Sequence, residues 1–386
     1  MMNYKKIILK TLILTGCMTS FLLSQNSPDA FAQTVSNKHQ AQNITINIQG
    51  SSYSVQSQPF IRNGTVYIPL REVSNGLSSA VTWNSQNKQI TISQPGQKIV
   101  MMLGKTTATR NNKEVKLANP PIIRDNQVYV SIRSVAELMQ AKVNWSPTDR
   151  SVEVIPNTNL MMVNGGSKFY WVNHTNGKVH YASSSVDEPK LAGTMTLDIQ
   201  GYTQLELVSS GKSEQLILTD NYGEPMINTA LYSALMVDGS LIKQTKVHYW
   251  QRFVPNVTYL GEQPVMTDGK VLYVLDTAGE VKQDYDLVKI IGLDETYSVE
   301  GIGDGFALVR PNTTGLLTLI NLKTLEPVQL YKQLNAQEQE YAEMNDVPYH
   351  GDEIKFKQEK DGILYFSYNS IFDGQKHDFT YKLEQK

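Results

Sequence analysis

The sequence predicts a mostly β protein in which two tandem copies of a small α+β unit precede an all-β domain. Two observations carry this prediction. One stretch of sequence recurs in the same register 62 positions further on. Beyond about residue 157, short apolar runs alternate with turn-forming residues, and helical periodicity is nearly absent. A third observation, a basic and then apolar beginning, predicts export of the chain.

The first 32 residues have the pattern of a signal peptide. Three lysines precede an uncharged, largely apolar run over residues 11–23, and Ala30-Phe31-Ala32 supplies a small-x-small cleavage pattern. The run is too short to span a bilayer comfortably, and no later stretch approaches the roughly 20 apolar residues of a membrane helix. We therefore expect cleavage after Ala32, a mature chain without a transmembrane helix, and a flexible lead-in over residues 33–43.

The single cysteine leaves an alternative at the N-terminus. Leu14-Thr15-Gly16-Cys17 resembles a bacterial lipobox, in which Cys17 would carry lipid. The apolar run continues past Cys17, however, whereas a lipoprotein signal normally stops at its cysteine. We expect a secreted or cell-wall-associated protein, with lipid anchoring through Cys17 as the alternative. After cleavage at Ala32 the mature chain would have neither disulfide nor thiol chemistry.

The charge balance bears on the class of partner. Removing three lysines and Asp29 with the signal takes the formal net charge from −2 to −4, and no run of like charges stands out. Nucleic-acid binding requires a basic footprint. The sequence therefore argues against nucleic acid as a partner.

The repeat is clearest where residues 59–73 align without a gap with residues 121–135. Further along, the same register brings a Val-x-Trp pattern ending at Trp83 onto one ending at Trp145. Chance does not hold one register over so many positions, so this is a tandem repeat. The two predicted copies cover residues 44–93 and 94–156.

Each copy is expected to place strands around one short helix. Residues 44–48 alternate apolar and polar, as a half-buried strand does. Asn63-Gly64 and Asp125-Asn126 are turn pairs that tolerate positive φ. The helices that follow have apolar residues at i, i+3 and i+7, namely Leu70, Val73 and Leu77 in copy one and Ile132, Val135 and Met139 in copy two.

Further positions refine this unit. Pro69 suits a first helical position, and Ser131 suits an N-cap. Residues 74–76 are poor helix formers, which predicts a shorter first helix. Aromatic residues that recur at equivalent positions are assigned to the structural core of the repeats: Tyr67, Trp83, Tyr129 and Trp145.

The pattern Asn-Gly-x-x-Tyr-Ile-Pro-Leu-Arg-x-Val, a short helix, Val-x-Trp, a polar turn and Ile-Thr-Ile resembles the copper amine oxidase N-terminal-like domain over about residues 44–155. That family occurs as tandem stalk repeats in secreted proteins of Gram-positive bacteria. Its name does not imply copper chemistry, because the domain is the stalk of the oxidase. The oxidase cofactor signature Thr-x-x-Asn-Tyr-Asp/Glu is missing, since Leu218 and Gly223 occupy its outer positions. We expect no cofactor.

Residues 165–386 are expected to form the all-β domain, with Asn164-Gly165-Gly166 at its boundary. Short strands and turns recur roughly every 8 to 20 residues, and a unit of very roughly 40 residues returns, which is the size of one propeller blade. This favours a propeller-like fold of about five blades, with a β-sandwich or irregular sheet as the alternative. Residues 333–344 are predicted to form a surface helix.

No catalytic motif emerges from the all-β domain. Nucleophile elbows, Ser-x-x-Lys and phosphate-binding loops are absent. His174 and His180 could face each other across one predicted hairpin, but a third metal ligand is not identifiable. Carboxylate pairs such as Asp352-Glu353 are interpreted as a solvated face, because sequence does not place two of them across a sugar.

Aromatic residues are the remaining candidates for ligand contact, because their rings can stack on sugars. We single out Trp171, Tyr249 and Trp250 as candidate ligand-binding residues. The sequence thus predicts a non-enzymatic envelope protein whose stalk repeats present a β-rich domain to a polysaccharide or an extracellular protein. A cell-wall hydrolase with a carboxylate site in residues 165–386 is one alternative. An extracellular sensor or inhibitor that binds a partner protein is the other.

Overall fold

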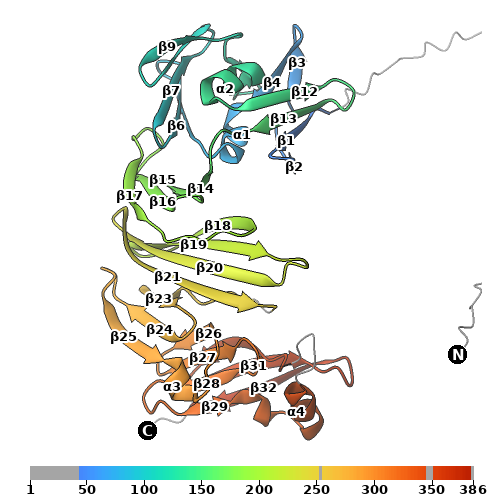
Figure 1. Cartoon of the computed structure of the whole chain (residues 1–386), viewed down its shortest axis with the longest axis vertical. Helices are drawn as coiled ribbons and strands as arrows, with labels where there is room; N and C mark the ends of the chain where they lie inside the picture. Colours follow the sequence, from blue (N-terminus) through green and yellow to red (C-terminus); the bar gives the residue numbers. More distant parts are fainter. Residues whose placement is uncertain (1–42, 252–253, 345–350, 384–386) are drawn as a thin grey trace, which may run out of the picture. The chain divides into compact units, whose positions relative to one another are not determined.

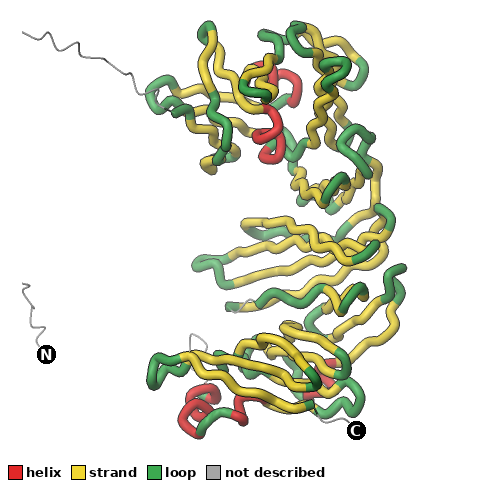
Figure 2. Tube along the Cα trace, turned by 180° about the vertical axis from the view of Figure 1, so that it is seen from behind, coloured by secondary structure: helices red, strands yellow, loops and turns green. Residues whose placement is uncertain are grey.

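The computed structural model describes residues 43–251, 254–344 and 351–383, so the predicted signal peptide, Cys17 and nearly all of the lead-in lie outside the described residues. Strands predominate in these ranges, and the helices are short (Figures 1 and 2). The predicted mostly β fold is therefore confirmed. None of the described helices has the length and hydrophobicity needed to cross a membrane.

The elements of the first copy return 62 residues later as those of the second: β1 corresponds to β8, β4 to β11 and α1 to α2. The region comprises β1 (Thr45–Ile48), β2 (Ser51–Tyr53), β3 (Phe60–Arg62), β4 (Thr65–Pro69), α1 (Leu70–Gly76), β5 (Ala80–Asn84), β6 (Gln89–Gln94), β7 (Gln97–Met102), β8 (Thr107–Arg110), β9 (Lys113–Lys116), β10 (Ile122–Arg124), β11 (Gln127–Ser131), α2 (Ile132–Met139), β12 (Lys142–Ser146) and β13 (Ser151–Ile155).

The two copies are intertwined in three sheets. The order β12-β13-β1-β2 joins the end of copy two to the start of copy one, with Ile46 opposite Val152 in parallel strands. The order β5-β6-β7-β8-β9 joins the end of copy one to the start of copy two. In the third sheet, the hairpins β3–β4 and β10–β11 meet through antiparallel β4 and β11. Each of the three sheets contains strands of both copies. The boundary expected between residues 93 and 94 therefore separates the copies in sequence but not in space.

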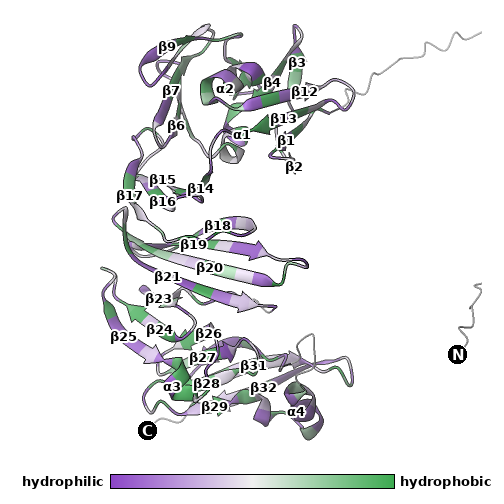
Figure 3. Ribbon diagram, viewed as in Figure 1, coloured by the Kyte–Doolittle hydropathy of each residue, from purple (hydrophilic) through white to green (hydrophobic). Residues whose placement is uncertain are grey.

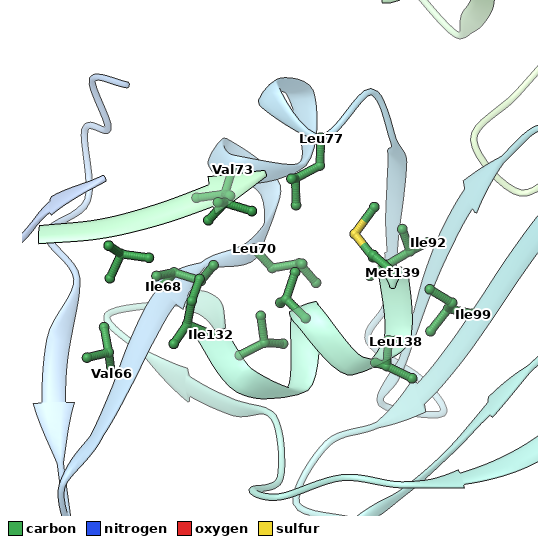
Figure 4. Packing of buried hydrophobic residues seen from close by; sticks show 14 of the residues in the cluster. Val66, Ile68, Leu70, Val73, Leu77, Ile92, Ile99, Ile132, Leu138 and Met139 are labelled. Atoms are coloured by element: carbon green, nitrogen blue, oxygen red, sulfur yellow. The ribbon is translucent and has the colours of Figure 1, made fainter. Parts of the chain in front are cut away.

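One hydrophobic core serves both copies. The predicted stripes are buried, with Leu70 and Val73 of α1 and Val135 of α2 at most 1 % exposed. Figure 4 shows side chains of both helices and of neighbouring strands in one interior. Tyr67 and Tyr129 are buried as well.

Trp83 and Trp145 are half-buried against this core. Their strands, β5 and β12, are the edge strands of their sheets. The two tryptophans therefore border the core and do not fill it.

Most of the local turn and cap signals of the repeats are realised. Asn63 and Asp125 have positive φ in their turns. The Ser131 hydroxyl accepts a hydrogen bond from the backbone N–H of Ser134 at 3.1 Å at the start of α2, as expected of an N-cap. Pro69 differs from expectation, because it ends β4 and α1 begins one residue later.

Beyond β13 the described residues form five successive antiparallel sheets, β14–β17, β18–β21, β22–β25, β26–β29 and the three-stranded β30–β32. Strands adjacent in sequence are adjacent in each sheet, as in the blades of a propeller. Their bounds are β14 (Leu160–Gly165), β15 (Lys168–Asn173), β16 (Lys178–Ala182), β17 (Lys190–Thr194), β18 (Tyr202–Ser210), β19 (Ser213–Tyr222), β20 (Asn228–Val237), β21 (Ser240–Trp250), β22 (Tyr259–Leu260), β23 (Gln263–Thr267), β24 (Val271–Leu275), β25 (Val281–Asp286), β26 (Tyr297–Gly303), β27 (Phe306–Pro311), β28 (Thr318–Asn321), β29 (Pro327–Gln329), β30 (Lys355–Lys360), β31 (Ile363–Asn369) and β32 (Lys376–Lys382).

Each of these sheets packs on the next one along the chain. The first and second share a cluster around Tyr170 and Leu218. The fourth and fifth share another around Phe306 and Phe366. Similar clusters join the second sheet to the third and the third to the fourth. This sheet-on-sheet packing makes the second half propeller-like, as the sequence predicts.

The first of the five sheets begins earlier than expected. Gly165 ends β14, and Gly166 lies in the turn to β15, so the boundary expected at residue 165 falls within a hairpin. In the described part of the later sheets, two α-helices and one 3-10 helix follow strands: α3 (Leu287–Ile291), η1 (Leu330–Gln333) and α4 (Ala336–Glu343). Helix α4 lies where the sequence predicts one, and Figure 3 shows it mostly hydrophilic.

Candidate ligand-binding groove

Two of the three aromatic candidates lie inside the protein. Trp171 and Tyr249 are 0 % and 1 % exposed. The Trp171 Nε1–H donates to the carbonyl oxygen of Ser78 at 2.8 Å, and the Tyr249 hydroxyl donates to Oδ1 of Asn256 at 3.1 Å. Neither ring offers a face to a ligand from solution, which corrects the role expected for them. Trp250 remains accessible at 43 % exposure.

The titratable candidates do not come together in one site either. Asp352, expected on a solvated face, is buried against Arg310, with 2.6 Å between Oδ1 and Nη1. His180 lies opposite Trp171 in the β15–β16 pairing and not opposite His174. Burial lowers the pKa of His180. Within the described ranges, no three His, Cys, Asp or Glu side chains come together as metal ligands.

A candidate ligand-binding groove lies over one face of the β18–β21 sheet. There, a cavity of about 400 Å³ opens above β18, β19 and β20. Alternate residues of a strand share a face, so Gln204 and Glu206 of the edge strand β18 point to the same side. The strand register then places their cross-strand neighbours beside them. Two rows form the floor, Gln204–Thr219–Leu231 and Glu206–Ile217–Ser233.

The opposite wall consists of residues 255–258 and part of β23. Gln215 joins floor and wall, because its Nε2 donates to the carbonyl oxygens of Thr258 at 2.5 Å and Val265 at 3.2 Å. Asn256 holds the same wall to the fourth sheet, with its Oδ1 accepting from the Val299 N–H at 2.7 Å. Buried hydrogen bonds of this kind hold both sides of the groove in place.

Four polar side chains of the floor remain uncommitted. Gln204, Glu206, Thr219 and Ser233 make no side-chain hydrogen bond or ion pair with any residue in the described ranges. Together they present amide, hydroxyl and carboxylate groups, and so both donors and acceptors. Of the described lining residues, Glu206 alone is ionisable. The described part of the groove is therefore a hydrogen-bonding surface without a cation.

Tyr202 extends this floor at the end of β18. It lies two residues before Gln204 on the same face of the strand, opposite Asn221, which lines the cavity. Tyr202 is 59 % exposed. Tyr202 was not predicted from the sequence, although one signal was present: Leu205 and Leu207 alternate with polar residues, which marks the other face of β18 as buried.

Residues 47–154 and 111–184 give two overlapping matches to one family model. That family is the copper amine oxidase N-terminal domain. The resemblance drawn from the repeat pattern is confirmed, and the match extends beyond β13 to the first sheet of the second half. The groove lies outside the residues that match the copper amine oxidase N-terminal domain.

Comparison with curated proteins finds no match. Similar solved structures include apo AztD from Citrobacter koseri, with 10 % identity, a TM-score of 0.24, and coverage of 65 % of this chain and 85 % of that chain. The β-propeller domain of the Trilobed protease from Pyrococcus furiosus has 10 % identity and a TM-score of 0.25, covering 79 % and 83 %. YCF48 from Cyanidioschyzon merolae has 8 % identity and a TM-score of 0.25, covering 75 % and 92 %.

Proposed function

We propose that this chain is a non-enzymatic binding protein of the bacterial cell envelope, in which repeats like the copper amine oxidase N-terminal domain present the five-sheet region. The ligand occupies the groove over β18–β20. The observation that carries this proposal is the set of four uncommitted polar side chains in a cavity of about 400 Å³. Ligand sites are typically concave, of this order of size, and combine apolar walls with a few placed polar groups.

The composition of the groove supports binding over hydrolysis. Enzymatic cleavage of a glycosidic bond generally uses two carboxyl groups about 5–9.5 Å apart. Among the described lining residues, Glu206 is the only carboxylate. Ser233 has no histidine or lysine in the described lining to act as its base. Asp352, a carboxylate named in the sequence analysis, is enclosed with Arg310.

Export is part of the proposal and rests on the sequence pattern of residues 1–32. Intact mass or N-terminal sequencing of the protein recovered from culture tests it. A mature chain that begins at Gln33 supports release into the medium or the wall. A diacylated Cys17 would place the protein on the membrane instead.

The groove is tested by binding to purified cell-wall sacculi, wall polysaccharides and surface proteins, with the full mature chain. We expect a variant with Gln204, Glu206, Thr219 and Ser233 all replaced by alanine to lose binding while its circular dichroism and melting temperature stay close to those of the parent.

The matched control carries Glu353→Ala and Gln358→Ala, two exposed polar residues of the fifth sheet and the loop before it. This control should bind like the parent. Equal binding by the four-alanine variant would refute the groove as the site. Turnover of a wall polymer that disappears in Glu206→Gln would show an enzyme instead.

A further inference from the structure

We propose that the groove binds a glycan of neutral or amino sugars, and that Tyr202 is the platform on which one sugar ring stacks. This inference rests on the proposed function, because it names the ligand class of the same groove. It is carried by three features of the floor: an exposed aromatic ring at one end, uncommitted neutral polar groups beside it, and a single carboxylate with no cation among the described lining residues.

The Tyr202 ring and two of the four polar side chains lie in one line along β18. Tyr202, Gln204 and Glu206 follow one another on the same face of β18, at a spacing of about 7 Å. Thr219 and Ser233 lie beside this line on the neighbouring strands. A sugar has an apolar ring face for stacking and hydroxyl groups at its edge for hydrogen bonds. A chain of sugars lying along β18 therefore meets both kinds of contact.

The charges of the floor select against polyanions. Glu206 repels phosphate and carboxylate groups, and no lysine, arginine or histidine lines the described part of the cavity to offset it. Lys243 belongs to the next row on the same face, but its Nζ lies over the Tyr273 ring at 4.3 Å. Recognition of anionic groups relies on such cations. The same carboxylate favours a protonated amino sugar over its neutral N-acetylated form.

A peptide ligand would use different groups. An extended peptide adds to a sheet by pairing its backbone with an edge strand. That mode would take its affinity from the backbone of β18, and the polar side chains of Thr219 and Ser233, on strands away from this edge, would have no role. The uncommitted side chains therefore favour a glycan over a peptide.

The test is calorimetry on the full mature chain with four probes: the hexamers of N-acetylglucosamine, glucosamine and β-1,4-linked glucose, and a polyglycerol-phosphate lipoteichoic acid. We expect at least one hexasaccharide to bind and the lipoteichoic acid not to bind. Tyr202→Ala should weaken hexasaccharide binding about tenfold, an effect of the size expected for loss of one aromatic contact. Tyr202→Phe should bind like the parent, because stacking needs the ring and not the hydroxyl.

Two further variants sharpen the result. Glu206→Gln should reduce any preference for the glucosamine hexamer over the N-acetylated hexamer. Trp250→Ala is the matched control, since Trp250 is an exposed aromatic residue at the end of β21 whose register places it on the opposite face of the sheet. Hexasaccharide binding should be unchanged in Trp250→Ala.

The outcomes separate this inference from the proposed function. Hexasaccharide binding that Tyr202→Ala leaves unchanged would overturn the platform. If no hexasaccharide binds, and a surface protein binds in a way that the four-alanine variant abolishes, the glycan class is refuted and the groove remains the binding site. If the four-alanine variant keeps all binding of the parent, both proposals fail.

Discussion

Tyr67 and Tyr129 occupy equivalent positions in the two repeats, and each hydroxyl donates a hydrogen bond to a backbone carbonyl of the other repeat. The Tyr67 hydroxyl donates to the carbonyl oxygen of Pro120 at 3.5 Å, and the Tyr129 hydroxyl donates to that of Gln58 at 3.4 Å. Gln58 and Pro120 are themselves equivalent, 62 positions apart. Phe60 lies between the two rings, with centroid distances of 5.5 Å to Tyr67 and 5.0 Å to Tyr129. Each copy is thus completed by the other.

This reciprocity predicts that one copy does not fold alone. A fragment covering residues 43–93 lacks β13 beside β1 and β11 beside β4, and it lacks half of the shared core. We expect its NMR spectrum to show the narrow amide dispersion of an unfolded chain, whereas residues 43–156 should give a dispersed spectrum. A folded 43–93 fragment would contradict the intertwined arrangement.

The tryptophans should differ in their importance for stability. Trp171 is fully buried and bonded to Ser78, so Trp171→Ala should cost about 3–5 kcal/mol of unfolding free energy. Trp83 is half-buried at a sheet edge, and Trp83→Ala should cost clearly less. Urea unfolding followed by circular dichroism measures both. A larger loss for Trp83→Ala would show that its ring is enclosed.

The buried charge cluster around Arg310 should be sensitive to the loss of its cation. Its guanidinium pairs with Glu300 and Asp352 while 5 % exposed. Burial would lower the pKa of Arg310, but these two carboxylates outweigh burial and raise it. Arg310→Met leaves both carboxylates without their cation, which should cost about 3–5 kcal/mol in urea unfolding.

The matched control for that variant is Arg124→Met. Arg124 forms an exposed pair with Asp125, at 3.3 Å, and exposed pairs contribute about 0–1 kcal/mol. Equal costs for the two variants would mean that the pair with Asp352 is open to solvent.

Stability should fall at alkaline pH through the buried tyrosines. Burial, and then the carboxylates of Glu295 and Asp294, raise the pKa of Tyr297 from 10.0 to about 12. Because the folded protein holds the proton more tightly than the unfolded chain, this contribution is complete below pH 10 and is lost as pH rises toward about 12. Tyr297→Phe should flatten that decline in urea unfolding. Tyr202→Phe, at an exposed ring, should not; an unchanged slope in Tyr297→Phe would contradict the assignment.

Much of the local structure was accessible from the sequence. The stripe of Leu70, Val73 and Leu77, the turn at Asn63 and Gly64, and the succession of strands in the second half all follow from spacing and turn chemistry within short segments. The N-cap at Ser131 follows in the same way. These features depend on neighbours along the chain, and the hydrophobic periodicity of each segment records them.

Strand pairing and surface exposure depended on segments far apart in sequence. Tyr202 and Tyr249 belong to one cross-strand row, Tyr202–Asn221–Thr229–Tyr249, on one face of one sheet. Tyr202 is 59 % exposed and Tyr249 is 1 % exposed. The sequence by itself predicted an all-β domain over residues 165–386, to which both tyrosines belong. The tertiary structure decided which would face solvent, because the wall that carries Asn256 covers the β21 end of the row, where Asn256 bonds the Tyr249 hydroxyl, and leaves the β18 end open.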